Sequence, residues 1–347
     1  MKSRGFPVLA ALAAFMVAGV VAGAGAAGTN GIAGGNIVYA GTDPRDGTAD
    51  IYVMKADGSA TTNLTHDVGS RKDLSPELSR DGSKIVFTRQ FASGGKHLMV
   101  VNADGSGLTD VTPTTFARQD IVDPSWSPDG NQVVYSSNAD GNYELYTLKV
   151  GNESATRLTS TKWPTQNFDP VWSPSGKAIA FSRTGLSLTS AAASLFQIRV
   201  DGTAASRLTR TITGDGDVSP DYSPDGRQIA FSSDRAGNDD VYILDLASFS
   251  VTMLTRQPTK DRDVDPAFAP DGSALVFVSD RSGATELWAL NLMSLTPGPG
   301  AAVQLTSDGA PKSHPSWGPD AAQPLPLPAA TSGPQPLPPA AVAPPAA

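Results

Sequence analysis

A short segment led by a proline recurs six times along this chain of 347 residues, and it constrains the fold more than any other feature. The clearest copy is Pro124-Ser125-Trp126-Ser127-Pro128-Asp129-Gly130, in which an aromatic residue precedes a Ser-Pro-Asp-Gly turn. The leading prolines lie 48, 46, 50, 46 and 49 residues apart and are Pro76, Pro124, Pro170, Pro220, Pro266 and Pro315. A fixed period of this length indicates an array of one supersecondary unit, whose stacked copies bury a continuous core.

Each unit contains the patterns of four short strands. A continuous apolar run such as Ile229-Ala230-Phe231 follows the turn, which is typical of a strand buried on both faces. An alternating strand and a short strand that ends on a threonine, after leucine in five units and after valine in one, complete the unit. The turn signals between the strands favour an antiparallel meander. Six meanders arranged radially predict an all-β fold, a six-bladed β-propeller with four-stranded antiparallel blades.

The two ends of the repeat array predict how the ring closes. The first strand pattern, Asn36-Ile37-Val38-Tyr39, begins in the middle of a unit, and the last copy stops at Asp320, also within a unit. We therefore expect N- and C-terminal strands to share one blade, because an open ring would leave sheet faces and edges exposed.

Outside the expected propeller at 36–320, the composition changes at both ends. Lys2 and Arg4 precede an apolar run and small residues, so residues 1–26 are predicted to be a cleaved signal peptide, with an uncleaved membrane anchor as the alternative. Residues 27–35 are a short linker. Residues 321–347 contain nine prolines and no charge and are expected to be a disordered Pro/Ala-rich tail. We expect an exported protein, periplasmic or extracellular, with no stable membrane span after signal cleavage.

The amino-acid composition excludes some kinds of site and some classes of partner. The chain has no cysteine, which excludes disulfides, thiolate metal sites and cysteine nucleophiles. Its formal net charge is −8 at pH 7, so nucleic acid is not expected as a partner and basic partners are favoured. We expect a monomer.

Carboxylates gather just ahead of the leading prolines, where the chain is expected to enter the innermost strands beside a central channel. The candidate residues are Asp73, Asp123, Asp169, Asp217, Asp263, Asp265 and His314. Carboxylates held close together repel one another, and a cation such as Ca²⁺ or a basic partner would relieve the repulsion. The alternative is that these side chains only cap the starts of the strands. We expect partner or cation binding at this channel mouth, while the sequence identifies no metal-ligand set and no other cofactor.

Strand direction places the second turn of each unit and the crossovers on one face, here called the loop face. The first turns lie on the opposite face, the turn face. The loop face carries irregular sequence, and variable loops on a rigid scaffold are where binding usually resides. Its candidate partner-binding residues are Asp43, Arg45, Asp46, Asp234, Arg235, Asp280 and Arg281. The Ser-Pro-Asp-Gly aspartates match type I turns and are expected to be scaffold.

The sequence contains no recognisable catalytic motif. It has no Gly-x-Ser-x-Gly elbow and no glycine-rich phosphate loop, and His66, His97 and His314 form no ligand pair. We therefore expect no catalytic residues and a non-enzymatic chain. Two alternatives stay open: a metal-dependent propeller hydrolase or lyase that uses His314 with the aspartates, and an accessory module of a separately encoded peptidase.

Several of these motifs resemble repeats of the TolB-like six-bladed β-propeller family, which includes the propeller domain of the Tol–Pal protein TolB. The matching residues are Asp-Pro-Ser-Trp-Ser-Pro-Asp-Gly at 123–130, the run at 229–238 and the Arg-Leu-Thr strand ends at 157–159 and 207–209. The resemblance implies binding of a protein or peptide at the channel mouth in the cell envelope, with a Pal-like lipoprotein as a candidate partner. Membership of a Tol–Pal system stays open, because residues 27–35 leave no room for the α/β domain that precedes the propeller in TolB.

Overall fold

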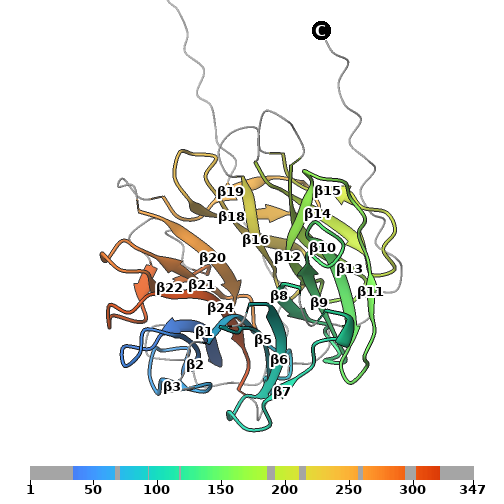
Figure 1. Cartoon of the computed structure of the whole chain (residues 1–347). Helices are drawn as coiled ribbons and strands as arrows, with labels where there is room; N and C mark the ends of the chain where they lie inside the picture. The colour runs from blue at the N-terminus through green and yellow to red at the C-terminus, as the bar shows by residue number, and fades with distance from the viewer. Residues whose placement is uncertain are drawn as a thin grey trace, which may run out of the picture.

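The computed structural model describes residues 34–66, 71–92, 94–116, 119–185, 192–210, 216–256, 261–293 and 302–320. Within them the chain forms six four-stranded sheets arranged around a central axis (Figure 1). The predicted signal peptide, all but the last two residues of the linker, and the Pro/Ala-rich tail lie outside the described residues. In the part that is described, no helix is long and apolar enough to cross a membrane.

Five blades are continuous in sequence, and in each the first strand lies nearest the axis (Figure 1). Blades 2 and 3 consist of β4 (Lys72–Leu78), β5 (Lys84–Gln90), β6 (Lys96–Asn102) and β7 (Thr109–Asp110), then β8 (Ile121–Trp126), β9 (Gln132–Ser137), β10 (Glu144–Lys149) and β11 (Ala155–Arg157). Blades 4 and 5 consist of β12 (Gln166–Trp172), β13 (Ala178–Thr184), β14 (Ser194–Arg199) and β15 (Ser206–Arg207), then β16 (Asp217–Tyr222), β17 (Gln228–Ser233), β18 (Asp240–Asp245) and β19 (Val251–Met253). Blade 6 consists of β20 (Asp263–Phe268), β21 (Ala274–Ser279), β22 (Glu286–Asn291) and β23 (Ala302–Gln304). A short 3₁₀ helix, η1 (Thr114–Phe116), lies between blades 2 and 3 in the chain.

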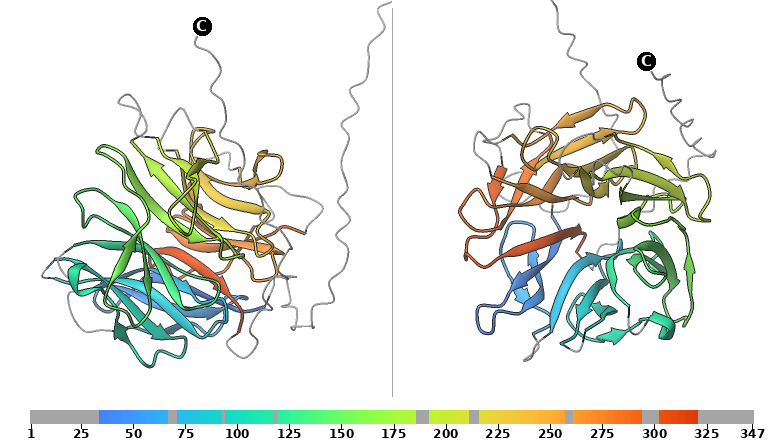
Figure 2. Two further views of the ribbon diagram at one scale, coloured as in Figure 1. Left: turned by 90° about the vertical axis from the view of Figure 1, so that its right-hand side faces the viewer. Right: turned by 45° about the horizontal axis from the view of Figure 1, so that its top comes forward.

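Blade 1 closes the ring as the sequence predicted. Its innermost strand is the C-terminal β24 (Lys312–Gly318), which pairs antiparallel with β1 (Asn36–Thr42), followed outward by β2 (Ala49–Lys55) and β3 (Thr62–Asn63). The two ends of the ring therefore lie side by side (Figure 2). At this junction the indole nitrogen of Trp317 donates a hydrogen bond to the Gly34 carbonyl at 3.3 Å. Gly35 has a φ of +115°, and a Cβ there would lie 2.3 Å from the Gly318 carbonyl oxygen, so only glycine fits.

The core lies between blades and not at the axis. Six clusters of buried apolar side chains each join one blade to the next, and the second strand of every blade is buried on both faces. The large side chain two positions after each leading proline, Leu78 in blade 2 and an aromatic residue in the other five blades, belongs to these clusters, as Trp126 does between blades 2 and 3. This packing explains why the repeat demands an apolar run at the second strand and a large side chain before the first turn.

Two repeated polar contacts hold the ends of the strands. In the first turns of blades 2, 3 and 5 the serine hydroxyl binds the aspartate, as Ser127 Oγ donates to Asp129 Oδ1 at 2.6 Å, and the turn glycine has positive φ. At the outer edge, the threonine that ends each unit's Leu-Thr or, in blade 2, Val-Thr pair accepts a hydrogen bond from a backbone N–H of the third strand at 2.8 to 3.0 Å. These threonines are Thr65, Thr112, Thr159, Thr209, Thr255 and Thr306.

Candidate functional site: the central channel

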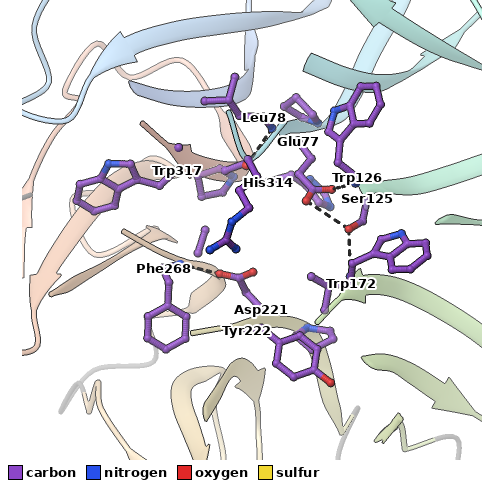
Figure 3. Close-up of a pocket in the computed structure, with 18 of the residues that line it drawn as sticks. Glu77, Leu78, Ser125, Trp126, Trp172, Asp221, Tyr222, Phe268, His314 and Trp317 are labelled. Atoms are coloured by element: carbon purple, nitrogen blue, oxygen red, sulfur yellow. Dashed lines mark hydrogen bonds between the residues drawn. The ribbon is translucent and has the colours of Figure 1, made fainter. Parts of the chain in front are cut away.

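The innermost strands of all six blades surround a cavity of about 250 Å³ on the axis of the ring (Figure 3). It runs from the residues before the leading prolines to the prolines of the first turns, so it extends toward the turn face. Its wall is built from two rings of equivalent positions, one from each blade. We call them the bulge ring and the strand ring.

The bulge ring consists of the residues directly before the leading prolines: Ser75, Asp123, Asp169, Ser219, Asp265 and His314. All six have left-handed backbone with φ between 48° and 52°, a region that non-glycine residues seldom adopt. Each lies where the pairing between the first and second strands shifts register. The following proline disfavours the helical region for the residue before it, and a bulge re-aims that side chain. The same local sequence therefore presents one side chain per blade to the channel.

Hydrogen bonds connect neighbouring members of the bulge ring. Ser75 Oγ donates to Asp123 Oδ1 at 3.1 Å, and Ser219 Oγ donates to Asp265 Oδ1 at 3.0 Å. Asp265 also accepts the His314 backbone N–H at 3.3 Å, and the His314 Nδ1 atom lies 3.9 Å from Asp265 Oδ2. The bulge ring is thus a circle of oxygen atoms with one imidazole.

The charges in this ring perturb one another. Burial, and then the neighbouring charge of Asp123, raise the pKa of Asp169 to about 7. Burial alone would lower the pKa of His314, but the negative charges of Asp265, Asp123 and Asp169 raise it overall. An imidazolium beside these carboxylates is therefore stabilised, and the ring favours positive charge within the channel.

The strand ring consists of the residues directly after the leading prolines: Glu77, Ser125, Val171, Asp221, Ala267 and Ser316. Four of them reach across to the next blade and accept the backbone N–H of its innermost strand (Figure 3). Glu77 Oε2 accepts from Trp126 at 2.8 Å, and Asp221 Oδ2 accepts from Phe268 at 2.7 Å. Burial raises the pKa of Glu77 to about 8 and that of Asp221 to about 7. These side chains therefore join the blades around the channel and also supply carboxyl groups to its wall.

The seven residues predicted at the channel mouth separate into two groups. Asp123, Asp169, Asp265 and His314 lie together in the bulge ring, whereas Asp73, Asp217 and Asp263 are not among the residues that line the cavity. The last three are buried and bind arginines of their own blades at 2.5 to 2.7 Å, in the pairs Asp73–Arg89, Asp217–Arg235 and Asp263–Arg281. These three lie two residues before the bulge ring and are paired within their own blades, and their part in binding at the mouth stays a prediction.

The same ion pairs involve two of the predicted loop-face residues, Arg235 and Arg281, in contacts within the fold. Their neighbours Asp234 and Asp280 accept backbone N–H groups of Gly216 and Arg262 at 3.1 and 2.7 Å. Each of these four side chains thus binds its own scaffold in the second turn. Partner binding by these residues stays a prediction.

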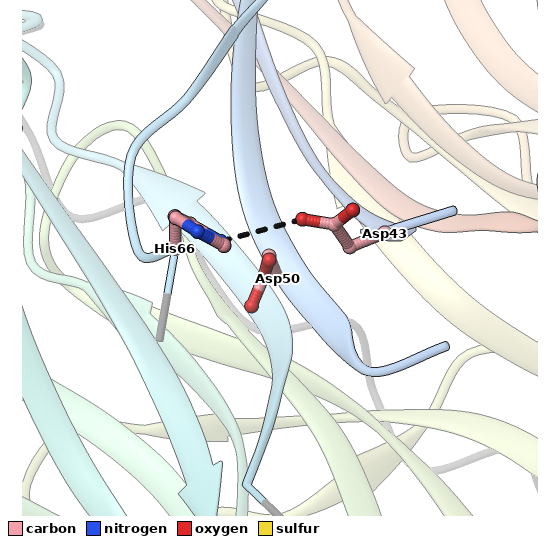
Figure 4. A group of neighbouring side chains, drawn as sticks. All are labelled: Asp43, Asp50 and His66. Atoms are coloured by element: carbon pink, nitrogen blue, oxygen red, sulfur yellow. Dashed lines mark ion pairs between the residues drawn. The ribbon is translucent and has the colours of Figure 1, made fainter. Parts of the chain in front are cut away.

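The remaining loop-face residues lie at the outer part of blade 1, where Asp43, Asp50 and His66 place ligand atoms close enough for a metal ion (Figure 4). The guanidinium of Arg45 already compensates the negative charge of this group. Arg45 Nε lies 2.9 and 3.0 Å from the two Asp43 oxygens, and Arg45 Nη2 lies 2.8 Å from His66 Nδ1. The hydrogen bonds from Arg45 hold the pKa of Asp43 well below its usual range. Asp46 accepts the Thr48 backbone N–H and hydroxyl at 2.9 and 2.6 Å.

Three residues of the channel wall were not singled out from the sequence: Glu77, Asp221 and Arg80. The first two could have been found, because a strand presents every second side chain to the same face and they lie two positions after the bulge ring. Arg80 stands where the first turns of the other five blades have proline.

The repeats are similar to those of known proteins. The family model described as TolB beta propeller domain matches residues 213–325. "Protein TolB homolog" of Chlorobium luteolum is 30% identical over 155 residues, which is 44% of this chain and 33% of that protein. "Tol-Pal system protein TolB" of Francisella tularensis subsp. mediasiatica is 44% identical over 62 residues, 18% of this chain and 14% of that protein. The chain thus spans a third or less of the length of these relatives.

Among solved structures, TolB from Acinetobacter baumannii superposes with a TM-score of 0.67 at 21% identity, covering 84% of this chain and 68% of that one. At this identity the superposition bears on the fold alone. It agrees with the six antiparallel blades and their closure through β1 and β24. Together these observations show a six-bladed β-propeller whose residues 213–325 match the model described as TolB beta propeller domain.

Proposed function

We propose that this chain is an exported, non-enzymatic TolB-like propeller that binds a protein or peptide of the cell envelope through its channel and loop face. The observation that carries the proposal is the bulge ring, in which Asp123, Asp169 and Asp265 surround one cavity. Glu77 and Asp221 add two carboxyl groups, while Arg80 and His314 are the basic residues of the same wall. The names of the relatives, which include Tol-Pal system protein TolB, support a general role in the cell envelope.

Electrostatics favours a positively charged ligand at this site. Two carboxylates about 6 Å apart at an effective dielectric of about 20 repel by roughly 3 kcal/mol. Burial and, after it, such repulsion from Asp123 raise the pKa of Asp169. A lysine or arginine side chain of a partner would relieve it. A Ca²⁺ ion would do the same, since carboxylate and hydroxyl oxygens are the ligands that calcium prefers.

The test is capture of the partner from an envelope fraction of the native cell, using the tagged full-length chain and cross-linking. We expect Asp123→Asn/Asp265→Asn to reduce the recovery of a mass-spectrometrically identified partner about tenfold or more, the loss typical of one charge-assisted contact. The control is Glu153→Gln/Asp201→Asn, which removes the same charge from exposed turns outside the channel. Equal recovery with both variants would contradict channel binding, and absence of the chain from the envelope and the medium would contradict export.

Metal analysis distinguishes the enzymatic alternative from the proposal. A metal-dependent hydrolase or lyase that uses His314 and the aspartates requires a stoichiometric ion and an activity that a chelator removes. An ion that chelation removes without any change in turnover of candidate substrates favours a binding role.

A further inference from the structure

Arg80 departs from the repeat at a position where the other five blades agree. The first turns of the other blades have Pro128, Pro174, Pro224, Pro270 and Pro319 here, and all five line the turn-face end of the channel. Proline at this corner of the turn fixes the backbone φ angle. An arginine at the same position lacks this restriction, so the turn loses more conformational entropy when the chain folds. A residue that departs from the local sequence preference of its turn and gains no structural contact in return is typically a functional residue.

The Arg80 side chain has no counter-ion within the described part of the chain. Its Nε atom is buried without a hydrogen-bond partner, and none of the carboxylates there lies within 4.0 Å of its guanidinium nitrogens. Burial lowers its pKa, but an arginine in a protein remains protonated. By contrast, the arginines of the interior, Arg89, Arg235 and Arg281, each bind an aspartate. A half-buried cation without a partner is unfavourable, and an anion from outside would compensate it.

The channel therefore offers opposite charges at two depths. Arg80 lies at the turn-face end, and the carboxylates of the bulge ring lie at the other end of the same cavity. The volume of about 250 Å³ lies below the ~300–1,000 Å³ of pockets for drug-sized ligands, so it suits one side chain rather than a folded ligand. A phosphate dianion is disfavoured, because it would share this space with five carboxyl groups.

We propose that the channel recognises a peptide that ends in a basic residue, entering from the turn face. The cationic side chain reaches the bulge ring, and the terminal carboxylate forms a paired contact with the Arg80 guanidinium. The planar fork of an arginine matches a carboxylate with two parallel hydrogen bonds. The inference rests on the channel part of the proposed function, independently of the loop face, and specifies the ligand of the channel.

Calorimetric titration with two forms of one peptide tests the inference. The probes are Ala-Ala-Lys with a free carboxylate and the same peptide as its C-terminal amide, and inorganic phosphate serves as a third ligand. We expect the full-length protein to bind the free acid about ten to a hundred times more tightly than the amide, as for a hydrogen-bonded charge pair. Arg80→Pro should abolish this preference, so that the free acid and the amide bind with equal affinity. Because proline occupies the turn in five blades, this variant is expected to fold.

A second variant and a control keep the result interpretable. Arg80→Gln retains length and removes the charge, so it should lose the same preference, whereas Arg227→Gln, in the exposed first turn of blade 5, should keep it. Equal affinity of the unmodified protein for acid and amide overturns the inference, and so does tighter binding of phosphate than of the free acid. If neither peptide binds while an envelope partner is still captured through Asp123 and Asp265, the inference fails and the proposed function stands.

Discussion

At the scale of single residues, the channel wall contains acids whose protonated form the fold favours. Glu77 accepts both Ser125 Oγ at 3.3 Å and the Trp126 N–H at 2.8 Å, yet burial outweighs these contacts and raises its pKa to about 8. Asp221 and Asp169 are shifted in the same direction, each to about 7. The channel therefore carries less negative charge near neutral pH than its five carboxyl groups suggest.

This shift makes stability depend on pH. Between the ordinary value of 4.5 and the folded-state pKa of about 8, the folded chain binds more protons at Glu77 than the unfolded chain. The free energy of unfolding therefore falls as the pH rises through this window, and Asp221 and Asp169 add to the fall. We expect the melting temperature to decline from pH 5 to pH 9 and Glu77→Gln to flatten the decline in scanning calorimetry. Asp201→Asn, in an exposed hairpin turn, should retain the slope, and an unaltered slope in Glu77→Gln would refute the assignment.

At the scale of elements, the first two strands of a blade are joined by a buried pair near the loop face. Asp73 and Arg89 are register partners on β4 and β5, and both are almost fully buried. Blade 4 has Asn167 and Arg183 in the same places, with Arg183 Nε donating to Asn167 Oδ1 at 2.7 Å. The fold therefore accepts an amide in place of the acid, provided that the arginine has an acceptor.

We expect removal of one partner to cost far more than removal of both. Arg89→Met leaves the Asp73 carboxylate buried without its guanidinium and should lower the free energy of unfolding by about 3–5 kcal/mol. Asp73→Leu/Arg89→Met removes both charges and should be more stable than the single variant. Urea unfolding followed by circular dichroism measures the difference. A double variant that is less stable than Arg89→Met would contradict the buried-charge explanation.

At the scale of the whole molecule, stability depends on closing the ring between β24 and β1. Trp317 belongs to the cluster between blades 6 and 1, and Lys55 Nζ binds Asp320 Oδ1 at 2.5 Å across the junction. Without β24, the edge of β1 and two interblade faces would be exposed to water. An open edge also invites pairing between chains.

Truncation tests the closure. A chain that ends at residue 311 lacks β24, so we expect loss of the single cooperative thermal transition together with increased light scattering. The matched control ends at residue 320, keeps every described strand, and should melt like the full-length chain. Identical melting curves for the two truncated chains would show that the ring does not depend on this strand.

The sequence by itself determined the number of blades, their four strands and the shared closing blade, because a repeat copies one set of local interactions six times. It also identified Asp123, Asp169, Asp265 and His314 beside the channel, since all four directly precede a leading proline. Their role as binding residues remains a prediction.

Only the tertiary structure decided which neighbouring acids face the lumen. Asp263 and Asp265 are two residues apart, yet one binds Arg281 inside the blade and the other lines the cavity. The physical reason is the bulge at the left-handed residue before each proline, which breaks the strict alternation of a strand. That the Arg80 guanidinium has no carboxylate partner among the described residues is likewise a property of the assembled ring, because whether a charge finds a partner depends on all six blades.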